Sequence, residues 1–143
     1  MASNSVVVTR GFSLIELLVA LAMIGVLTAM AIPNYQDYVL RSTRSDAQIA
    51  LVQLAQQQER YHSVNNTYAT TLAQLGATAA SPEGAYSLTL ANPSCTTSGY
   101  TGCFIVTATP AGQQAADAAC ATLTLDQSGL RGATGTDASE CWP

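Results

Sequence analysis

The sequence has few charges and few of the side chains used in catalysis. Charged residues make up 10% of its 143 residues, well below the roughly 25% of ordinary soluble domains. There is one histidine, His62, and the chain contains neither a nucleophile-base constellation nor a Gly-rich phosphate loop. We therefore expect no enzymatic activity and no cofactor.

Lysine is absent. The chain has five arginines and nine acidic residues, which gives a formal net charge of −4. The arginines of the main part of the chain are Arg41, Arg44, Arg60 and Arg131. They are too few and too scattered to predict a phosphate track, and we expect them to be solvated or to lie at subunit interfaces. DNA is thus not an expected partner.

The length fits one small domain, whose surface must be covered mainly by uncharged polar residues and alanine.

One long apolar run stands near the start of the chain. Residues 14–32 are apolar apart from Glu16, with Gly25 and Thr28 as mild interruptions. As a helix rising about 1.5 Å per residue, this run spans a bilayer core. Residues 1–10, which are polar at their start and end in Arg10, precede it, so cleavage near Gly11 would keep the apolar segment on the mature chain as an anchor, unlike an ordinary secretory signal.

The helix is expected to continue beyond Pro33 to about His62, with a bend at the proline. Positions recurring at steps of three and four form one apolar stripe, while other positions are polar. The stripe consists of Ala47, Ala50, Leu51, Leu54, Gln58 and Tyr61. Arg44 and Gln48 fall elsewhere on the helical wheel. The second half of the helix should therefore carry a domain on its stripe.

Alternating apolar and polar residues then predict short strands at 86–90, 104–108 and 121–125. A turn at 126–129 predicts a return as a fourth, edge strand at 130–133. The predicted fold class is α+β, with a long N-terminal α-helix, membrane-spanning in its first half and amphipathic in its second, packed on a small antiparallel β-sheet.

The cysteines all lie in the last third of the chain, at Cys95, Cys103, Cys120 and Cys141. An even number in an anchored chain that leaves the cytoplasm predicts two disulfides and an oxidising compartment, although four cysteines allow three pairings. The long intervals between them and the distant His62 do not supply the closely spaced ligand pairs of a zinc site. No metal site is expected.

Residues 10–17, Arg-Gly-Phe-Ser-Leu-Ile-Glu-Leu, resemble the processing motif of type IV pilins and pseudopilins. The resemblance implies a pilin fold and a prepilin leader at 1–11, with cleavage by prepilin peptidase after Gly11 and methylation of the new N-terminal Phe12. It also implies a transmembrane and filament-core half of the helix at 12–33 and a globular domain at 34–143.

The same resemblance assigns roles in assembly. A carboxyl such as Glu16 in an apolar helix costs about 3 kcal/mol at the bilayer centre, and the family implies that it pairs with the N-terminal amine of a neighbouring subunit. Gly25 and Pro33 bracket a stretch that loses helical hydrogen bonds in related filaments. The disulfide-bound loop of pilins implies the pair Cys120–Cys141, which leaves Cys95–Cys103.

The family resemblance predicts a structural subunit of a type IV pilus, most like a minor pilin of the PilE type. Expected partners are other pilin subunits, prepilin peptidase, the inner-membrane assembly platform and the membrane before assembly. The N-terminus should be cytoplasmic and the globular domain periplasmic in the bacterial inner membrane, and the mature subunit should end in the extracellular pilus. A major pilin, a type II secretion pseudopilin and a DNA- or surface-binding subunit remain open alternatives.

Overall fold

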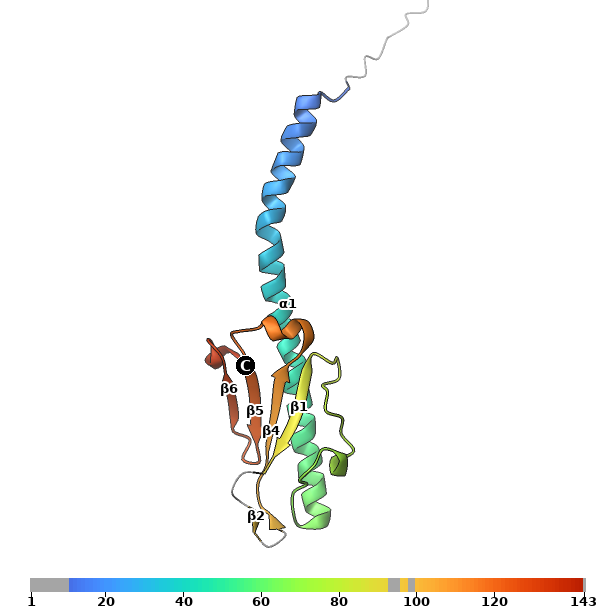
Figure 1. The fold of residues 1–143 in the computed structure, drawn as a ribbon, viewed down its shortest axis with the longest axis vertical. Helices are drawn as coiled ribbons and strands as arrows, with labels where there is room; N and C mark the ends of the chain where they lie inside the picture. Colours follow the sequence, from blue (N-terminus) through green and yellow to red (C-terminus); the bar gives the residue numbers. More distant parts are fainter. Residues whose placement is uncertain (1–10, 93–95, 98–99, 143) are drawn as a thin grey trace, which may run out of the picture. The chain divides into compact units, whose positions relative to one another are not determined.

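The computed structural model describes residues 11–92, 96–97 and 100–142. The chain divides into two compact units, Met1–Tyr38 and Val39–Pro143. One helix, α1 (Leu14–Asn65), contributes residues to both (Figure 1). The predicted helix is thereby confirmed and is three residues longer than expected at its C-terminal end.

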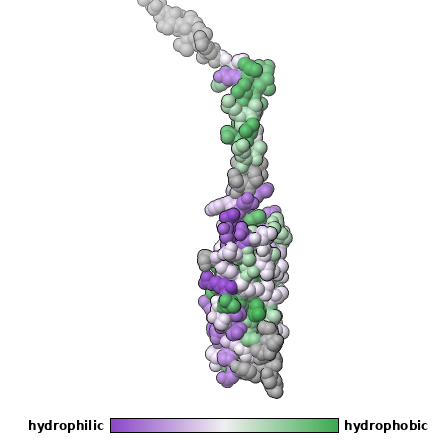
Figure 2. Space-filling view, turned by 90° about the vertical axis from the view of Figure 1, so that its left-hand side faces the viewer, coloured by the Kyte–Doolittle hydropathy of each residue, from purple (hydrophilic) through white to green (hydrophobic). Residues whose placement is uncertain are grey.

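In the first unit, α1 is an apolar helix. The backbone N–H groups of Glu16 and Leu17 donate to the Ser13 carbonyl at 3.1 and 3.2 Å, which begins the helix. Every side chain from Gly11 to Met30 is exposed, and this stretch has the hydrophobic colouring in Figure 2. By length and composition, this is a helix that could cross a membrane.

In the second unit, which we call the globular unit, four antiparallel strands form one sheet in the order β1-β4-β5-β6. This confirms the predicted sheet and its edge strand. The strands are β1 (Tyr86–Ala91), β4 (Ile105–Pro110), β5 (Thr122–Asp126) and β6 (Arg131–Thr134). A second, two-stranded sheet pairs β2 (Thr96–Thr97) with β3 (Tyr100–Thr101). Three short 3₁₀ turns are η1 (Ala73–Leu75), η2 (Gly112–Ala116) and η3 (Ala138–Glu140).

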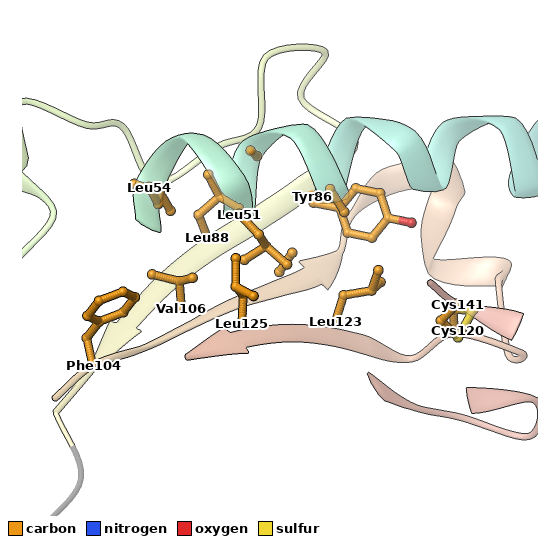
Figure 3. Close-up of a cluster of buried hydrophobic side chains, with 13 residues drawn as sticks. Leu51, Leu54, Tyr86, Leu88, Phe104, Val106, Cys120, Leu123, Leu125 and Cys141 are labelled. Carbon is orange, nitrogen blue, oxygen red and sulfur yellow. A yellow bond between two sulfur atoms is a disulfide. The ribbon is translucent and has the colours of Figure 1, made fainter. Parts of the chain in front are cut away.

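The core lies between the second half of α1 and one face of the four-stranded sheet (Figure 3). The strand register sets Leu88 beside Ala108 and Ala108 beside Leu123, so one row of apolar side chains crosses three strands. On the helix, Leu51 is fully buried and Leu54 almost fully buried against this face. Burying each such leucine stabilises the fold by about 1.5–3 kcal/mol.

The opposite face of the sheet carries hydroxyl groups. The register aligns Thr89 with Thr107 and Thr107 with Thr124, and the hydroxyls of Thr122 and Thr134 lie 2.6 Å apart. Threonine is stiff at χ1 and fits a pleated, half-exposed surface. This alternation explains why the strands could be located from the sequence.

Two buried polar side chains fasten loops to α1. Gln58 is fully buried, and its amide donates to the Ala69 carbonyl at 3.1 Å and accepts from the Ala69 N–H at 2.9 Å. The carboxylate of Asp46 accepts hydrogen bonds from the Ser81 hydroxyl and, at 3.1 Å, from the Glu83 N–H. The segment between α1 and β1 is therefore held at both of its ends.

Gly135 follows β6 at a position that no other residue fits. Its φ is +136°, and an added Cβ would lie 2.2 Å from the Ala119 carbonyl oxygen. We expect Gly135→Ala to lower the free energy of unfolding by about 2–4 kcal/mol, through backbone strain and overlap with a neighbouring backbone. Urea unfolding of the full-length chain in detergent, followed by the fluorescence of Trp142, measures the loss.

The matched control is Gly76→Ala, at φ +67° with open space around the added Cβ. It should cost about 1–2 kcal/mol, from backbone strain alone. Equal losses for the two variants would show that the contact with Ala119 has no energetic consequence.

Candidate functional site

The predicted processing site is exposed. Gly11, Phe12 and Ser13 precede α1 outside the helix, and the Phe12 side chain is 87% exposed. Among the described residues beyond its chain neighbour Phe12, no atom lies within 4 Å of the position of a Cβ on Gly11. Residues 1–10 of the predicted leader lie outside the described residues. A peptidase could therefore reach the Gly11–Phe12 bond, and cleavage there stays a prediction.

Glu16 lies in the first turn of α1, among exposed apolar side chains such as Ile15 and Leu17. A carboxylate is favoured there by the partial positive charge of the helix N-terminus. The helix is unbroken at Gly25 and at Pro33. Near Gly25, the Thr28 hydroxyl donates a hydrogen bond to the Ile24 carbonyl at 2.7 Å. This carbonyl therefore has a side-chain donor besides the backbone N–H groups of the helix. The assembly roles of Glu16, Gly25 and Pro33 stay predictions.

The C-terminal tail is tied to the sheet and to α1. A disulfide joins Cys120, just before β5, to Cys141, just after η3, and both residues are fully buried. The Gln48 amide donates to the Cys141 carbonyl at 3.0 Å. The indole N–H of Trp142 donates to the Gly132 carbonyl at 2.8 Å. The predicted pairing of Cys120 with Cys141 is therefore present in the structure.

This bond closes a loop of 21 residues and should contribute about 3 kcal/mol to the free energy of unfolding. Cys95 lies outside the described residues, so its bond to Cys103 stays a prediction. We expect non-reducing peptide mapping of protein from the cell surface to recover both pairs. Peptides joining Cys95 to Cys120 or to Cys141 would contradict it.

A buried ion pair joins α1 to the η2 segment, and it corrects the expectation that Arg44 is solvated. Its side chain is only 9% exposed. The Arg44 Nε and Nη2 groups donate to the two carboxylate oxygens of Asp117 at 2.7 and 2.8 Å. The wheel assigned Arg44 to the polar positions away from the apolar stripe, and that assignment is wrong, because the chain near Asp117 returns to cover this side of the helix.

Gln114 extends this pair into a network. Its amide nitrogen lies 3.0 Å from the Leu40 carbonyl, 3.0 Å from the Tyr86 hydroxyl and 3.1 Å from the Asp117 carboxylate. The hydrogen bonds that Arg44 donates to Asp117 raise the pKa of Arg44. Burial pushes the pKa of Asp117 upward, but Arg44 and backbone N–H donors outweigh it and lower that pKa. Burial raises the pKa of Tyr86 to about 12.

Three arginines gather around the tail, which corrects the expectation that they are scattered. The Arg131 guanidinium lies 5.2 Å from the centre of the Trp142 ring, and Arg41 lies 3.9 Å from the Glu140 carboxylate. A shallow hollow of about 220 Å³, here called the tail hollow, is lined by Arg41, Arg44, Gln48, Glu140 and Trp142. Arg60 lies elsewhere, beside Gln57 and Tyr61.

Within the ranges that the structure describes, no three His, Cys, Asp or Glu side chains are placed to hold a metal ion. The features that stand out are an exposed apolar helix, a small globular unit carried by the end of that helix, and a disulfide-bound tail. They are the features of a small protein that combines a helix able to cross a membrane with a globular unit. A family model agrees with this assignment.

That model is described as "Type IV minor pilin ComP, DNA uptake sequence receptor" and matches residues 33–124. Because the match covers more than half of the chain, this protein belongs to that family of type IV pilins. A second model, the prokaryotic N-terminal methylation motif, matches residues 8–32. The predicted family is thus confirmed.

Comparisons with a solved structure and with curated proteins support the same family. The structure of a type IV pilin from Shewanella oneidensis superposes with a TM-score of 0.53 and 31% identity, covering 73% of this chain and 98% of that one. Fimbrial protein EcpC of Eikenella corrodens is 58% identical over 40 residues, 28% of this chain and 26% of EcpC. Type IV major pilin protein PilA of Myxococcus xanthus is 39% identical over 67 residues, 47% of this chain and 30% of PilA. The chain thus matches less than a third of the length of these two proteins.

Proposed function

We propose that this chain is a minor pilin that is cleaved after Gly11, methylated at Phe12, and anchored in the inner membrane before it enters the pilus. In this proposal the N-terminus is cytoplasmic, the globular unit is periplasmic, and prepilin peptidase and the inner-membrane assembly platform act on the chain in turn. The observation that carries the proposal is the methylation motif at residues 8–32, which includes the exposed apolar start of α1. The family description supports the minor-pilin assignment.

The N-terminus of the mature protein tests the proposal. We expect intact-mass measurement and N-terminal sequencing of protein from sheared pili to find a chain that begins at N-methylated Phe12. The polar leader cannot serve as the anchor, because the apolar segment lies after Gly11. Assembled, surface-exposed protein that still carries Met1–Arg10 would refute the processing scheme. A copy number equal to that of the main pilus subunit would refute the minor role.

A second candidate function is DNA binding, because the description of the matching family includes a DNA uptake sequence receptor. The grouping of Arg41 and Arg131 around Trp142 also favours it. Against it stand four arginines and nine acids beyond Arg10, a net charge of about −5 that opposes a polyanion. Electrophoretic mobility shift of duplex DNA by the full-length chain decides between the two, and our expectation remains that DNA is not bound.

A further inference from the structure

We propose that the tail hollow binds the phosphate of an anionic lipid headgroup while the chain is held in the membrane. The inference rests on the proposed membrane-anchored precursor. It adds a ligand to a site formed by α1 and the disulfide-bound tail. The groups that carry it are Arg44, Arg41 and Trp142, with Arg131 beside them.

Arg44 provides a fixed donor. Asp117 binds its Nε and Nη2 groups, so the guanidinium plane cannot rotate freely. Its Nη1 group has no acceptor among the described residues, and Arg44 lines the hollow. A guanidinium that is oriented in advance is well suited to a phosphate oxygen, because little side-chain entropy is lost on binding.

Arg41 provides a second donor that is easily recruited. It precedes Arg44 by three positions and Gln48 by seven, so all three lie on one side of α1. Its partner is Glu140 at 3.9 Å, and the two side chains are 67% and 57% exposed. Such a pair contributes little, so a phosphate can replace the Glu140 carboxylate on Arg41. Glu140 is therefore a competitor of the ligand.

Trp142 forms the other wall of the hollow, and its ring contacts the guanidinium of Arg131. The Arg131 guanidinium lies 5.2 Å from its ring centre, a cation-π distance. Tryptophan is enriched where proteins meet the headgroup layer, because its ring is apolar and its N–H is polar. The wall is held in place, since Cys141 is disulfide-bonded and the Trp142 N–H is bonded to Gly132.

The position of the hollow in the chain favours a lipid over DNA. Only nine residues separate Arg41 from the end of the apolar run at residue 32. So short a connection keeps this arginine near the membrane in which the apolar run is anchored. The anchor also raises the effective lipid concentration, so one weak headgroup contact is enough. Duplex DNA needs a longer track of cations than this negatively charged chain offers.

The test uses the full-length chain in an uncharged detergent and the fluorescence of Trp142, the single tryptophan in the sequence. We expect phosphatidylglycerol to change the emission saturably, with a midpoint at least about tenfold lower than that of zwitterionic phosphatidylcholine. Arg41→Gln and Arg131→Gln should each raise the midpoint about fivefold, as expected for one cation near anionic lipid. Native mass spectrometry counts bound lipid independently of the fluorescence.

Two matched controls sharpen the result. Arg60→Gln removes an arginine outside the hollow and should leave the midpoint unchanged. Glu140→Gln should lower the midpoint, because it removes the competing carboxylate, whereas Glu83→Gln, outside the lining of the hollow, should not. An unchanged midpoint in Glu140→Gln would contradict the exchange of partners on Arg41.

Three outcomes would overturn the proposal. Equal midpoints for the two lipids would show an apolar rather than a phosphate contact. Inorganic phosphate that saturates the response as well as phosphatidylglycerol does would identify a site for free phosphate. Duplex DNA that displaces the lipid, with binding lost in Arg41→Gln, would assign the hollow to DNA. The titration does not depend on pilus assembly, so its failure leaves the N-terminal processing result untouched.

Discussion

Replacing Arg44 by methionine is expected to lower the free energy of unfolding by about 3–5 kcal/mol, because it leaves the Asp117 carboxylate buried without its cation. Asp117 is 5% exposed, so water cannot substitute for the lost partner. Urea unfolding of the full-length chain in detergent, followed by Trp142 fluorescence, gives the value. The double variant Arg44→Met with Asp117→Leu should regain at least half of the loss, because it removes both charges.

The matched control is Arg41→Met, one helical turn earlier, where an exposed pair should cost no more than about 1 kcal/mol. The pKa of Asp117 lies below its ordinary value of 3.8, so the stability from this pair is present above that pH and is lost as the pH falls through the lowered pKa. The difference between wild type and Arg44→Met should therefore shrink as the pH is lowered from about 5 to about 2. A difference that stays constant would show that Arg44 acts through packing alone.

Changing Glu16 to valine is expected to leave the amount of protein in the membrane unchanged and to reduce its incorporation into filaments severely. Valine makes insertion easier, since it removes a carboxyl from the apolar segment. In the filament, the N-terminal ammonium of a neighbouring subunit would lose its counter-charge in apolar surroundings, at a cost of about 3–5 kcal/mol. The ratio of protein in sheared filaments to protein in membranes measures the effect.

Glu83→Val is the control for that experiment, because it removes an exposed carboxylate from a loop of the globular unit. It should enter filaments as well as the wild type. If Glu16→Val does so too, charge pairing does not drive incorporation, and Glu16 must instead serve processing by the peptidase. Detection of uncleaved Glu16→Val protein in the membrane would point to that second role.

Much of the fold could be predicted because apolar residues recur at a regular spacing along each helix or strand. Leu51 and Leu54 belong to a stripe with helical spacing, and Leu123 and Leu125 alternate with threonines. Both patterns report which face is buried without reference to any other part of the chain. The processing motif was equally visible, since it consists of adjacent residues. Local pattern was therefore sufficient for the helix, the sheet and the family.

The polar contacts could not be predicted in the same way. Asp117 lies 73 residues from Arg44, in an Ala- and Gln-rich segment that shows no periodicity. Nothing near Arg41 indicates that Trp142 will lie beside it. The position of Gln58 was informative, because an amide on an apolar stripe needs hydrogen-bond partners when it is buried. Only the structure shows that its partner is the backbone of Ala69. The strands β2 and β3 have two residues each, too few for any alternation.

The contacts that hold the tail also fix when the globular unit can finish folding. Gln48 reaches across 93 residues to the Cys141 carbonyl, and Arg44 reaches across 73 residues to Asp117. A nascent chain makes α1 before the tail, so the charge of Arg44 has no partner until 73 further residues have been made. Contacts of such sequence separation form late and slow folding. The unit therefore closes only after Cys141 has been made, and a chain that lacks the segment around Cys141 would expose its core.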